Sequence, residues 1–541
     1  MSLVIERNLR YLESIQPAAA RLLRRASPSG SLLPVTTRDG HPGFRTARKT
    51  IHSLYAPYRD AARTAGRTVG SDTATVVVFG LGGGFLAQTL IRDYPGVVVI
   101  VVERSWNILR TILERVDLSK EIARGRLRLT VTPDELLQTL RDVHVSPVRP
   151  EITTTSLDPW VEHEENLAHF TACRTMYDRF RRETDEEART IRRFGRRWLV
   201  HTLHNTRHMR VAADGTSAFR RLHAIIQKKR VVIAAAGPSL DRFLAVQADA
   251  LRSGLYTIIA VDTALPALLQ RGITPLAVVV LDPQCWSILH IRETLPENVF
   301  LLLDAGVTPG IANRTREDSI LWFVGLHPLH RLLFSRGAPV CGLPLATVSV
   351  TEAAIALTRG LGADRIELVG ADGGFPHGTT YGAGTYHYGL ATRRAHRLTP
   401  QSTFFADQVY PNTSATDRNG LFFSSATLDE RFGRLLATLR HPVNLAFPAT
   451  PAAVRFDPDR FWKHHLMELD RSIERLTSAE IDHDPAMPQL MALLGPHGVA
   501  HLPAASSLQE SGYTGTGPLY RQIAVALKKI RGFILEENDR Y

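Results

Sequence analysis

Short apolar runs alternate with helix-like segments through the middle of the chain, and most runs end directly at a polar residue or glycine. The predicted strands cover residues 231–236, 256–261, 277–281, 299–303, 320–324 and 366–369. Their apolar residues are continuous, as in strands that are buried on both faces of a sheet. Strands that alternate with helices in this way predict a parallel, doubly wound α/β domain.

Polar side chains follow several of these strands directly. The residues in these positions are Ser239, Asp262, Asp282, Asp304 and Asp372. In doubly wound sheets, ligands bind beyond the carboxyl ends of the strands. A single Asp in such a place is explained as a helix cap, whereas the repetition favours a ligand site.

The first of these strand ends carries the turn Gly237-Pro238-Ser239, followed by a predicted helix. Glycine allows the backbone to turn sharply and to approach a ligand closely, and proline is well suited to open a helix. The free N–H groups at the helix start would bind a phosphate or a carboxylate. The alternative is a strand-to-helix turn without a ligand.

A loop rich in glycine, tyrosine and histidine follows Asp372. Residues 375–388 include His377, Tyr381, Tyr386 and His387. Such a loop suits a lid over a substrate, with a histidine as proton acceptor. The alternative is a glycine-rich surface loop with incidental aromatic residues.

A second glycine pattern lies closer to the N-terminus. A predicted strand over 73–79 leads into a loop with Gly80, Gly82 and Gly84, then a helix, and then a strand over 97–102 that ends at Glu103. An acidic residue about 20 residues beyond the glycines is typical of dinucleotide or adenosylmethionine sites. The alternative is a scaffold of the same kind that binds no ligand.

These patterns together predict an α/β protein with two Rossmann-like domains and a mainly helical C-terminal region. The predicted domains are an N-terminal Rossmann-like domain (1–155), a helical connector (156–225), a central α/β domain (226–400) and a C-terminal region (401–541). Predicted helices in the last region cover 428–439, 461–476 and 518–536.

Composition narrows the class of protein. The 541 residues require more than one core, and 44% hydrophobic with 22% charged residues is typical of a soluble globular chain. A formal charge of +12 favours anionic partners such as nucleotides, but no aromatic-interleaved basic tract predicts nucleic-acid binding.

Cysteine spacing and hydropathy predict the setting. The three cysteines are far apart and offer neither a disulfide framework nor a zinc site, which favours a reducing, cytoplasmic location. The longest apolar runs are too short to span a membrane. The chain lacks a G-x-x-x-x-G-K-[ST] loop and a G-x-S-x-G elbow, so a nucleotide-using transferase is the most natural remaining class.

Three motifs in order resemble a known family. They are Ala236-Gly237-Pro238-Ser239-Leu240-Asp241, then Asp282-Pro283-Gln284, then Gly370-Ala371-Asp372 with the loop after it. They resemble the central domain of motility-associated factor (Maf) glycosyltransferases. That domain is also labelled MptE-like, after an archaeal 6-hydroxymethylpterin diphosphokinase. The resemblance covers most of residues 50–390.

The resemblance implies a cytoplasmic enzyme that transfers a nonulosonic acid from a CMP-activated donor to Ser or Thr of flagellin, in support of motility. The central domain of the family is similar to bacterial sialyltransferases. This similarity implies a nucleotide and donor site formed by Gly237, Pro238, Ser239, Asp262, Thr263, Asp282 and Gln284. It implies catalytic residues among Asp372, His377, Tyr381 and His387, with Tyr386 also near the reacting centre.

Two alternatives remain at this point. The first is a diphosphokinase that uses ATP and Mg²⁺ on a pterin-like substrate, with Asp282 and Asp372 as metal ligands. The second is a flagellin-binding assembly factor without catalysis. The sugar-transfer hypothesis leaves the use of Mg²⁺ open. The two enzyme hypotheses are separated by whether CMP or ATP with Mg²⁺ raises the melting temperature.

Overall fold

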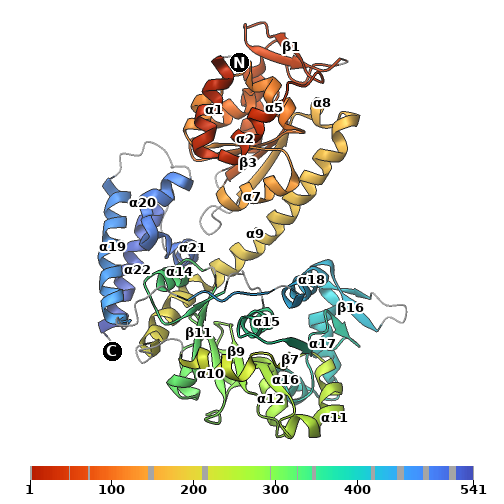
Figure 1. Ribbon diagram of the computed structural model, residues 1–541, viewed down its shortest axis with the longest axis vertical. Helices are drawn as coiled ribbons and strands as arrows, with labels where there is room; N and C mark the ends of the chain where they lie inside the picture. Colours follow the sequence, from red (N-terminus) through yellow and green to blue (C-terminus); the bar gives the residue numbers. More distant parts are fainter. Residues whose placement is uncertain are drawn as a thin grey trace. The chain divides into compact units, whose positions relative to one another are not determined.

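The computed structural model divides into two compact units, Met1–Gly195 with Leu469–Tyr541 and Arg196–Glu468. Figure 1 labels their helices and strands, with colours that follow the sequence. It describes residues 3–47, 49–70, 73–143, 151–209, 217–292, 294–325, 327–343, 349–415, 421–440, 442–447, 456–478, 487–510 and 519–539. Residues 401–468 of the predicted C-terminal region thus belong to the second unit and 469–541 to the first.

The second unit is built on a seven-stranded sheet in which every pair of neighbours is parallel. In sheet order the strands are β12 (Cys341–Gly342), β11 (Ile320–Val324), β10 (Phe300–Asp304), β9 (Ala277–Val280), β8 (Thr257–Val261), β7 (Arg230–Ala234) and β13 (Arg365–Val369). The six predicted strands are therefore confirmed. The two-residue β12 was not predicted, because it is too short to carry a pattern.

The strand order reverses between β7 and β13. From β7 the chain adds strands outward on one side as far as β12, and then returns to place β13 on the other side of β7. Ligands of doubly wound sheets bind at such a reversal, outside the carboxyl ends of the two strands. The residues that follow β7 and β13 are Gly237-Pro238-Ser239 and Gly370-Ala371-Asp372.

Helices connect the strands of this sheet, as a parallel arrangement requires. They are α10 (Ser217–Ile226), α11 (Ser239–Arg252), α12 (Leu265–Leu269), α13 (Trp286–His290), α14 (Pro328–Ser335) and α15 (Val350–Gly360). Helix α15 is almost entirely apolar on its inner side and packs against β7, β8, β9 and β13. The buried residues of α15 therefore belong to the core that supports β7 and β13, the two strands at the reversal point.

Beyond β13 the second unit continues as a smaller layer. It contains β14 (Phe375–Pro376), α16 (Tyr386–Arg394), α17 (Gln401–Val409), β15 (Ser414–Ala415), β16 (Phe422–Ser424) and α18 (Ala426–Arg440). The three short strands form an antiparallel sheet in the order β14-β16-β15. Strands of two or three residues have no periodicity to detect, so the three strands were not predicted. Among the helices of this layer, α18 was predicted, whereas α16 and α17 were not.

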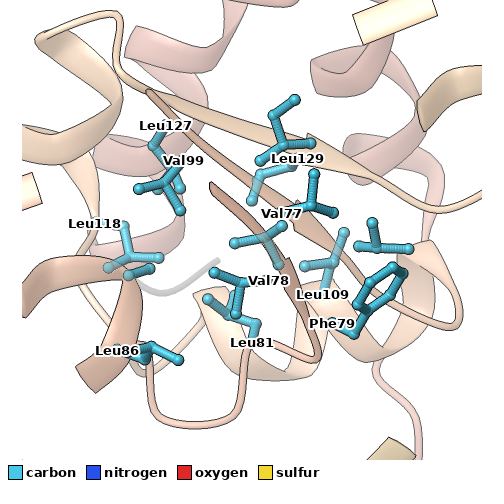
Figure 2. Packing of buried hydrophobic residues seen from close by; sticks show 14 of the residues in the cluster. Val77, Val78, Phe79, Leu81, Leu86, Val99, Leu109, Leu118, Leu127 and Leu129 are labelled. Atoms are coloured by element: carbon cyan, nitrogen blue, oxygen red, sulfur yellow. The ribbon is translucent and has the colours of Figure 1, made fainter. Parts of the chain in front are cut away.

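The first unit contains a four-stranded parallel sheet in the order β5 (Leu127–Thr130), β4 (Val98–Val102), β3 (Thr73–Phe79) and β6 (Glu151–Ser156). Figure 2 shows side chains of β3, including Val77 and Phe79, in the apolar core of this sheet. Strand β6 pairs in parallel with β3 but was not predicted, because its sequence Glu-Ile-Thr-Thr-Thr-Ser lacks an apolar run. Its threonines are β-branched and fit a strand all the same.

The remaining elements of the first unit are mostly helices. Before the connector they are α1 (Leu3–Ile15), α2 (Pro17–Arg25), the hairpin β1 (Leu33–Thr36) and β2 (Pro42–Arg45), α3 (Pro57–Thr68), α4 (Phe85–Asp93), α5 (Trp106–Leu113), α6 (Ser119–Ala123), α7 (Pro133–Val143) and α8 (Asp158–Val161). The connector is the 42-residue helix α9 (Glu164–Asn205), whose residues 196–205 belong to the second unit. The C-terminal helices are α19 (Pro458–Ser478), whose residues 458–468 belong to the second unit, and α20 (Met487–Val499), α21 (Leu502–Glu510) and α22 (Leu519–Asp539). The two α/β sheets and the helical C-terminal region confirm the predicted fold class.

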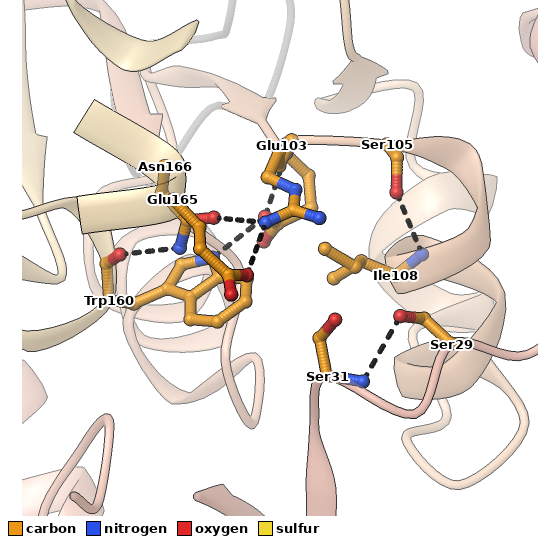
Figure 3. A network of polar contacts seen from close by, with 9 residues as sticks. Ser29, Ser31, Glu103, Ser105, Ile108, Trp160, Glu165 and Asn166 are labelled. Carbon is orange, nitrogen blue, oxygen red and sulfur yellow. Dashed lines mark hydrogen bonds and ion pairs between the residues drawn. The ribbon is translucent and has the colours of Figure 1, made fainter. Parts of the chain in front are cut away.

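Glu103, which ends β4, is fully buried and bonded within its own unit (Figure 3). One carboxylate oxygen accepts the backbone N–H of Leu81 at 3.0 Å. The other accepts the indole N–H of Trp160 at 2.8 Å and the backbone N–H of Arg104 at 2.8 Å. Burial raises the pKa of Glu103, and these hydrogen bonds oppose that shift. In a dinucleotide site the equivalent acid binds a ribose, whereas here both of its oxygens already have donors.

The glycine loop beside Glu103 is covered by side chains of the same unit. A Cβ added to Gly80 would lie 3.0 Å from Trp160, and one added to Gly82 would lie 2.7 Å from Leu157. Both glycines, and Gly84 as well, have positive φ angles, which glycine adopts most readily. This geometry favours the alternative in which the glycine pattern serves tight packing of a scaffold.

Replacement of Gly82 by alanine tests this packing role. Gly82→Ala places a methyl group against Leu157 at φ +54°, whereas Gly125→Ala has a similar φ of +68° and nothing within 4 Å of the added carbon. We expect both variants to lower the free energy of unfolding, and Gly82→Ala to lower it by about 1–3 kcal/mol more. Thermal and urea unfolding of the two variants measures the difference. Equal losses would show that Leu157 does not crowd this position.

Candidate functional site

The turn after β7 is bonded tightly to the segment after β13. The backbone N–H of Gly237 donates to the carbonyl oxygen of Gly370 at 2.8 Å. The Ser239 hydroxyl oxygen accepts the N–H of Gly370 at 3.1 Å. The Ser239 N–H, which opens α11, donates to a carboxylate oxygen of Asp372 at 3.3 Å. Asp372 thus occupies the place at a helix N-terminus where an external anion would otherwise bind.

Gly237 is required by this close approach. A Cβ at this position would lie 2.6 Å from the carbonyl oxygen of Gly370 and would also collide with the carboxylate of Asp372. The backbones of the two strand ends can meet only because the residue has no side chain. The sequence motif Gly-Pro-Ser therefore has a structural role in joining β7 to β13 at the reversal point.

The loop after Asp372 is anchored on the same turn. The N–H of Gly382 donates to the carbonyl oxygen of Ala236 at 2.8 Å. The N–H of Ala383 donates to the carboxylate of Asp241, in the first turn of α11, at 2.7 Å. Two residues on, the Thr385 hydroxyl accepts the N–H of Tyr388 and caps α16. The loop residues 381–387 are thereby held over the carboxyl edge of the sheet.

A second group of polar residues lies at the ends of β8 and β9. Asp262 follows β8 directly, is 3% exposed, and accepts a hydrogen bond from Nδ1 of His290 at 3.0 Å. His290 ends the short helix α13 and is 6% exposed. Its ring lies 5.5 Å from the ring of His387 and 6.0 Å from that of Tyr386, measured between centroids. The loop after β13 therefore meets the Asp262–His290 pair.

Asp282, at the end of β9, belongs to the same group. One of its carboxylate oxygens accepts the backbone N–H of Gln284 at 2.9 Å, and the other accepts the side-chain amide of Gln284 at 3.2 Å. Burial raises the pKa of Asp282, and the nearby charge of Asp262 raises it further. The pair of carboxylates therefore makes this edge of the sheet electronegative.

Tyr381 and His387 complete the group from the loop side. Their rings stack with centroids 4.6 Å apart and planes 22° from parallel. Burial raises the pKa of the Tyr381 hydroxyl, with further increases from Asp262 and Asp282. Burial also lowers the pKa of His387, and His290 lowers it further. Because His387 is neutral near pH 7, its ring can accept as well as donate a proton.

A third acidic strand end, Asp304, is the last residue of β10 and is part of the interior. Its carboxylate accepts the N–H of Gly306 at 2.8 Å and lies 3.8 Å from Nδ1 of His330. Burial raises the pKa of Asp304 to about 7 and lowers that of His330 to about 3. His330 in turn contacts the hydroxyl of Thr202, in α9, at 3.1 Å. These contacts join the end of α9 to the sheet and leave Asp304 little access to a ligand.

The structure thus brings together most of the residues that the sequence predicted. Gly237, Pro238, Ser239 and Asp372 form one cluster, and Asp262, Asp282, Gln284, Tyr381 and His387 form the other. Thr263 follows Asp262 and is half-buried. His377 lies apart: it is exposed, with a φ of +52°, and its N–H donates to Leu421 beside the small antiparallel sheet. A catalytic role for His377 stays a prediction.

Three residues near the site were not predicted from the sequence. They are His290, the 46%-exposed Trp286 at the start of the same helix, and Arg292, whose guanidinium carbon lies 5.4 Å from the ring centroid of Tyr386. The signal was present: Trp286 and His290 are four residues apart, so they share one face of a helix that begins just after Asp282. A helix of five residues gives too short a period to detect alone.

No group of three or more His, Cys, Asp or Glu side chains within the described ranges is arranged to hold a metal ion. Among the helices of the described part of the chain, none combines the length and apolar character that crossing a membrane requires.

Part of the second unit matches a family model. Residues 201–378 match the family described as 6-hydroxymethylpterin diphosphokinase MptE-like. This range includes the turn at Gly237 and the residues Asp262, Asp282, His290 and Asp372, and it ends before Tyr381. No curated protein matches the chain.

A solved structure has the same overall fold. The Maf glycosyltransferase from Magnetospirillum magneticum AMB-1 aligns over 99% of this chain and 96% of its own, with a TM-score of 0.58 and 14% sequence identity. Together with the family match, this likeness confirms the MptE-like domain and the Maf-like fold that the motifs predicted.

Substitution of Gly237 tests the junction between the two strand ends. Gly237→Ala places a methyl group against backbone and carboxylate, so we expect a loss of about 2 kcal/mol or more in the stability of the second unit. Gly325→Ala is the matched control, because Gly325 follows β11 and has nothing within 4 Å of the added carbon. Thermal unfolding with limited proteolysis measures both. A Gly237→Ala variant as stable as the control would contradict the close approach.

The buried carboxyl of Asp304 predicts a pH dependence. Its pKa is about 7 in the folded chain against an ordinary value of 3.8, so the folded state binds this proton more tightly. The contribution of Asp304 to stability therefore falls as pH rises from about 4 to about 7. Asp304→Asn removes this dependence while its side-chain oxygen can still accept the Gly306 N–H.

Urea unfolding of the wild type and Asp304→Asn at pH 5 and pH 7.5 checks the sign. We expect the variant to gain on the order of 2 kcal/mol relative to the wild type between these two pH values. His330 titrates in both proteins and so cancels in the comparison. A constant difference between the two proteins would contradict the raised pKa.

Proposed function

We propose that this protein is a glycosyltransferase that moves a nonulosonic, sialic-acid-like sugar from a CMP-activated donor to Ser or Thr of flagellin, and that it acts in the cytoplasm in support of motility. The observation that carries the proposal is the group formed by Asp262, Asp282, His290, Tyr381 and His387 at the carboxyl edge of an MptE-like domain. The Maf-like fold of the chain supports the same conclusion.

The site chemistry fits transfer of a sugar between two oxygen atoms. The acceptor hydroxyl attacks the anomeric carbon, the bond from that carbon to the phosphate oxygen breaks, and CMP leaves with the bonding electrons. The hydroxyl proton requires a neutral base, and an imidazole group serves this need near pH 7.

The leaving phosphate needs donors. The Tyr381 hydroxyl stays protonated, because burial and two nearby carboxylates raise its pKa, so it can donate to a phosphate oxygen. Arg292, over the ring of Tyr386, supplies a positive charge on the same side of the loop. In the proposal, the Gly237-Pro238-Ser239 turn supports the nucleotide indirectly, because it holds the loop residues 381–387 in place. Such preorganised donors stabilise charge that develops in the transition state.

The family match favours one alternative, a diphosphokinase that transfers a diphosphate from ATP to a pterin-like substrate. That reaction needs a divalent cation at the phosphates, which carboxylates such as Asp282 would help to hold. The two activities differ in nucleotide preference. CMP without a metal and ATP with Mg²⁺ therefore serve as the discriminating ligands.

The binding experiment uses the purified chain. We expect CMP to raise the melting temperature in proportion to its saturation, whereas ATP with Mg²⁺ leaves it unchanged. The opposite result would favour the diphosphokinase. Retained flagellin binding without a shift by either nucleotide would favour the non-catalytic assembly factor.

The activity experiment measures the intact mass of flagellin. Cells that lack this protein are complemented with the wild type, with Asp282→Asn, or with Asp318→Asn, which changes a half-exposed surface carboxylate paired with Arg316. We expect sugar-modified flagellin with the wild type and with the control. Asp282→Asn should give roughly 10- to 100-fold less, because the variant loses the charge-assisted contact that the Asp282 carboxylate is predicted to make with the donor. Flagellin of equal mass with and without the protein would refute the proposed acceptor.

A further inference from the structure

Asp262 and His290 form a buried hydrogen-bonded pair in which His290 is the donor. The carboxylate of Asp262 accepts from Nδ1 of His290 at 3.0 Å, and each side chain is 4% exposed. A carboxylate can only accept, so this bond fixes the proton of the neutral imidazole on Nδ1. The other ring nitrogen, Nε2, then carries a lone pair that is free to take a proton.

The Nε2 atom of His290 has no hydrogen-bond partner, although it is buried. An unpaired buried polar atom costs about 1–3 kcal/mol, and such atoms in folded proteins call for an explanation. Asp262, by contrast, is bonded; it directly follows β8, and His290 is the last residue of α13. The Nε2 atom of His290 is therefore a defined position at which a proton or a hydrogen-bond donor can bind.

The loop residues 381–387 cover the Nε2 atom of His290. Rings of Tyr386 and His387 lie beside His290, and Tyr381 stacks on His387. The loop contains Gly382 and Gly384, the latter with a φ of +87°, and it is joined to the sheet by only a few backbone bonds. Because these rings cover Nε2, a substrate hydroxyl reaches it only if the loop is displaced, a motion that is common in loops over active sites.

We infer that His290 is the general base that accepts the proton of the acceptor hydroxyl, and that Asp262 is the positioning residue that orients it. This inference rests on the proposed sugar transfer. Asp262 then orients His290, whereas the sequence predicted that Asp262 contacts the donor. In the step itself, the acceptor oxygen bonds to the anomeric carbon, CMP departs with the electron pair of the broken bond, and the proton passes to Nε2 of His290.

Several titratable or charged groups face His290 and influence its proton affinity. They come from four segments: Asp262 after β8, Asp282 after β9, Arg292 after α13, and Tyr381, Tyr386 and His387 from the loop. Of these groups, the Asp262 carboxylate is the one bonded to Nδ1 of His290, so its replacement tests the positioning role directly.

The first experiment measures transfer by the purified full-length chain, with a CMP-nonulosonic acid donor and flagellin as acceptor. We expect His290→Gln to lower kcat by roughly 100-fold or more, the usual contribution of a positioned base. The melting-temperature shift by CMP should match that of the wild type, because His290 does not hold the nucleotide. His396→Gln, which alters an exposed histidine of the same unit, serves as the control with unchanged kcat.

The second experiment uses Asp262→Asn, which keeps the size of the side chain. We expect a lower kcat and a displaced acid limb of the kcat–pH profile, because the amide no longer presents a negative charge to Nδ1 of His290. A loss of packing alone would lower kcat without moving that limb. Added imidazole should restore part of the activity of His290→Ala.

The outcomes separate the inference from the function on which it rests. If the wild type neither binds CMP nor modifies flagellin, the proposed function fails. If the wild type transfers the sugar and His290→Gln retains its kcat, the inference is overturned. Should His290→Gln fail to fold, Asp262→Asn decides the question, because a wild-type kcat and pH profile in that variant would equally overturn it.

Discussion

The second unit depends on the close approach of two strand ends, β7 and β13, at the point where the strand order reverses. Gly237 and Gly370 allow the two backbones to bond directly, and the side chain of Ser239 completes the junction. Buried backbone groups must be paired, so a side chain at Gly237 would break several bonds at once. Helix α11 begins at this junction. The carboxylate of Asp372 bonds to the first N–H of that helix, and the loop beyond Asp372 bonds to the turn before it.

The junction explains how a distant loop reaches the ends of β8 and β9. Gly382 and Ala383 bond to the turn and to Asp241, which directs Tyr386 and His387 toward His290. The same backbone contact therefore organises the acidic strand ends and the aromatic loop into one group. In this arrangement the Gly-Pro-Ser motif acts through geometry, since the N–H that opens its helix is already bonded to Asp372.

The two α/β sheets use acidic strand ends in different ways. In the first unit Glu103 accepts three hydrogen bonds from its own surroundings, and the glycine loop is packed beneath Leu157 and Trp160. In the second unit Asp304 is likewise part of the interior. Asp262 and Asp282 instead belong to the group that includes His290 and the loop residues Tyr381 and His387. The same sequence signal, an acid after an apolar run, therefore marks interior packing in some places and the candidate site in another.

The sequence by itself determined most strands of the two parallel sheets, because continuous apolar runs are buried on both faces, but not β6 or β12, which lack such runs. It also determined which residues stand at the strand ends, since chain order and strand polarity decide that. Only the tertiary structure decided which of these residues meet. The pairing of Asp262 with His290 joins segments 28 residues apart through a helix of five residues, and no local period encodes it. The separation of His377 from Tyr381 and His387, only a few residues apart in the chain, likewise depends on a short strand that pairs with a distant segment.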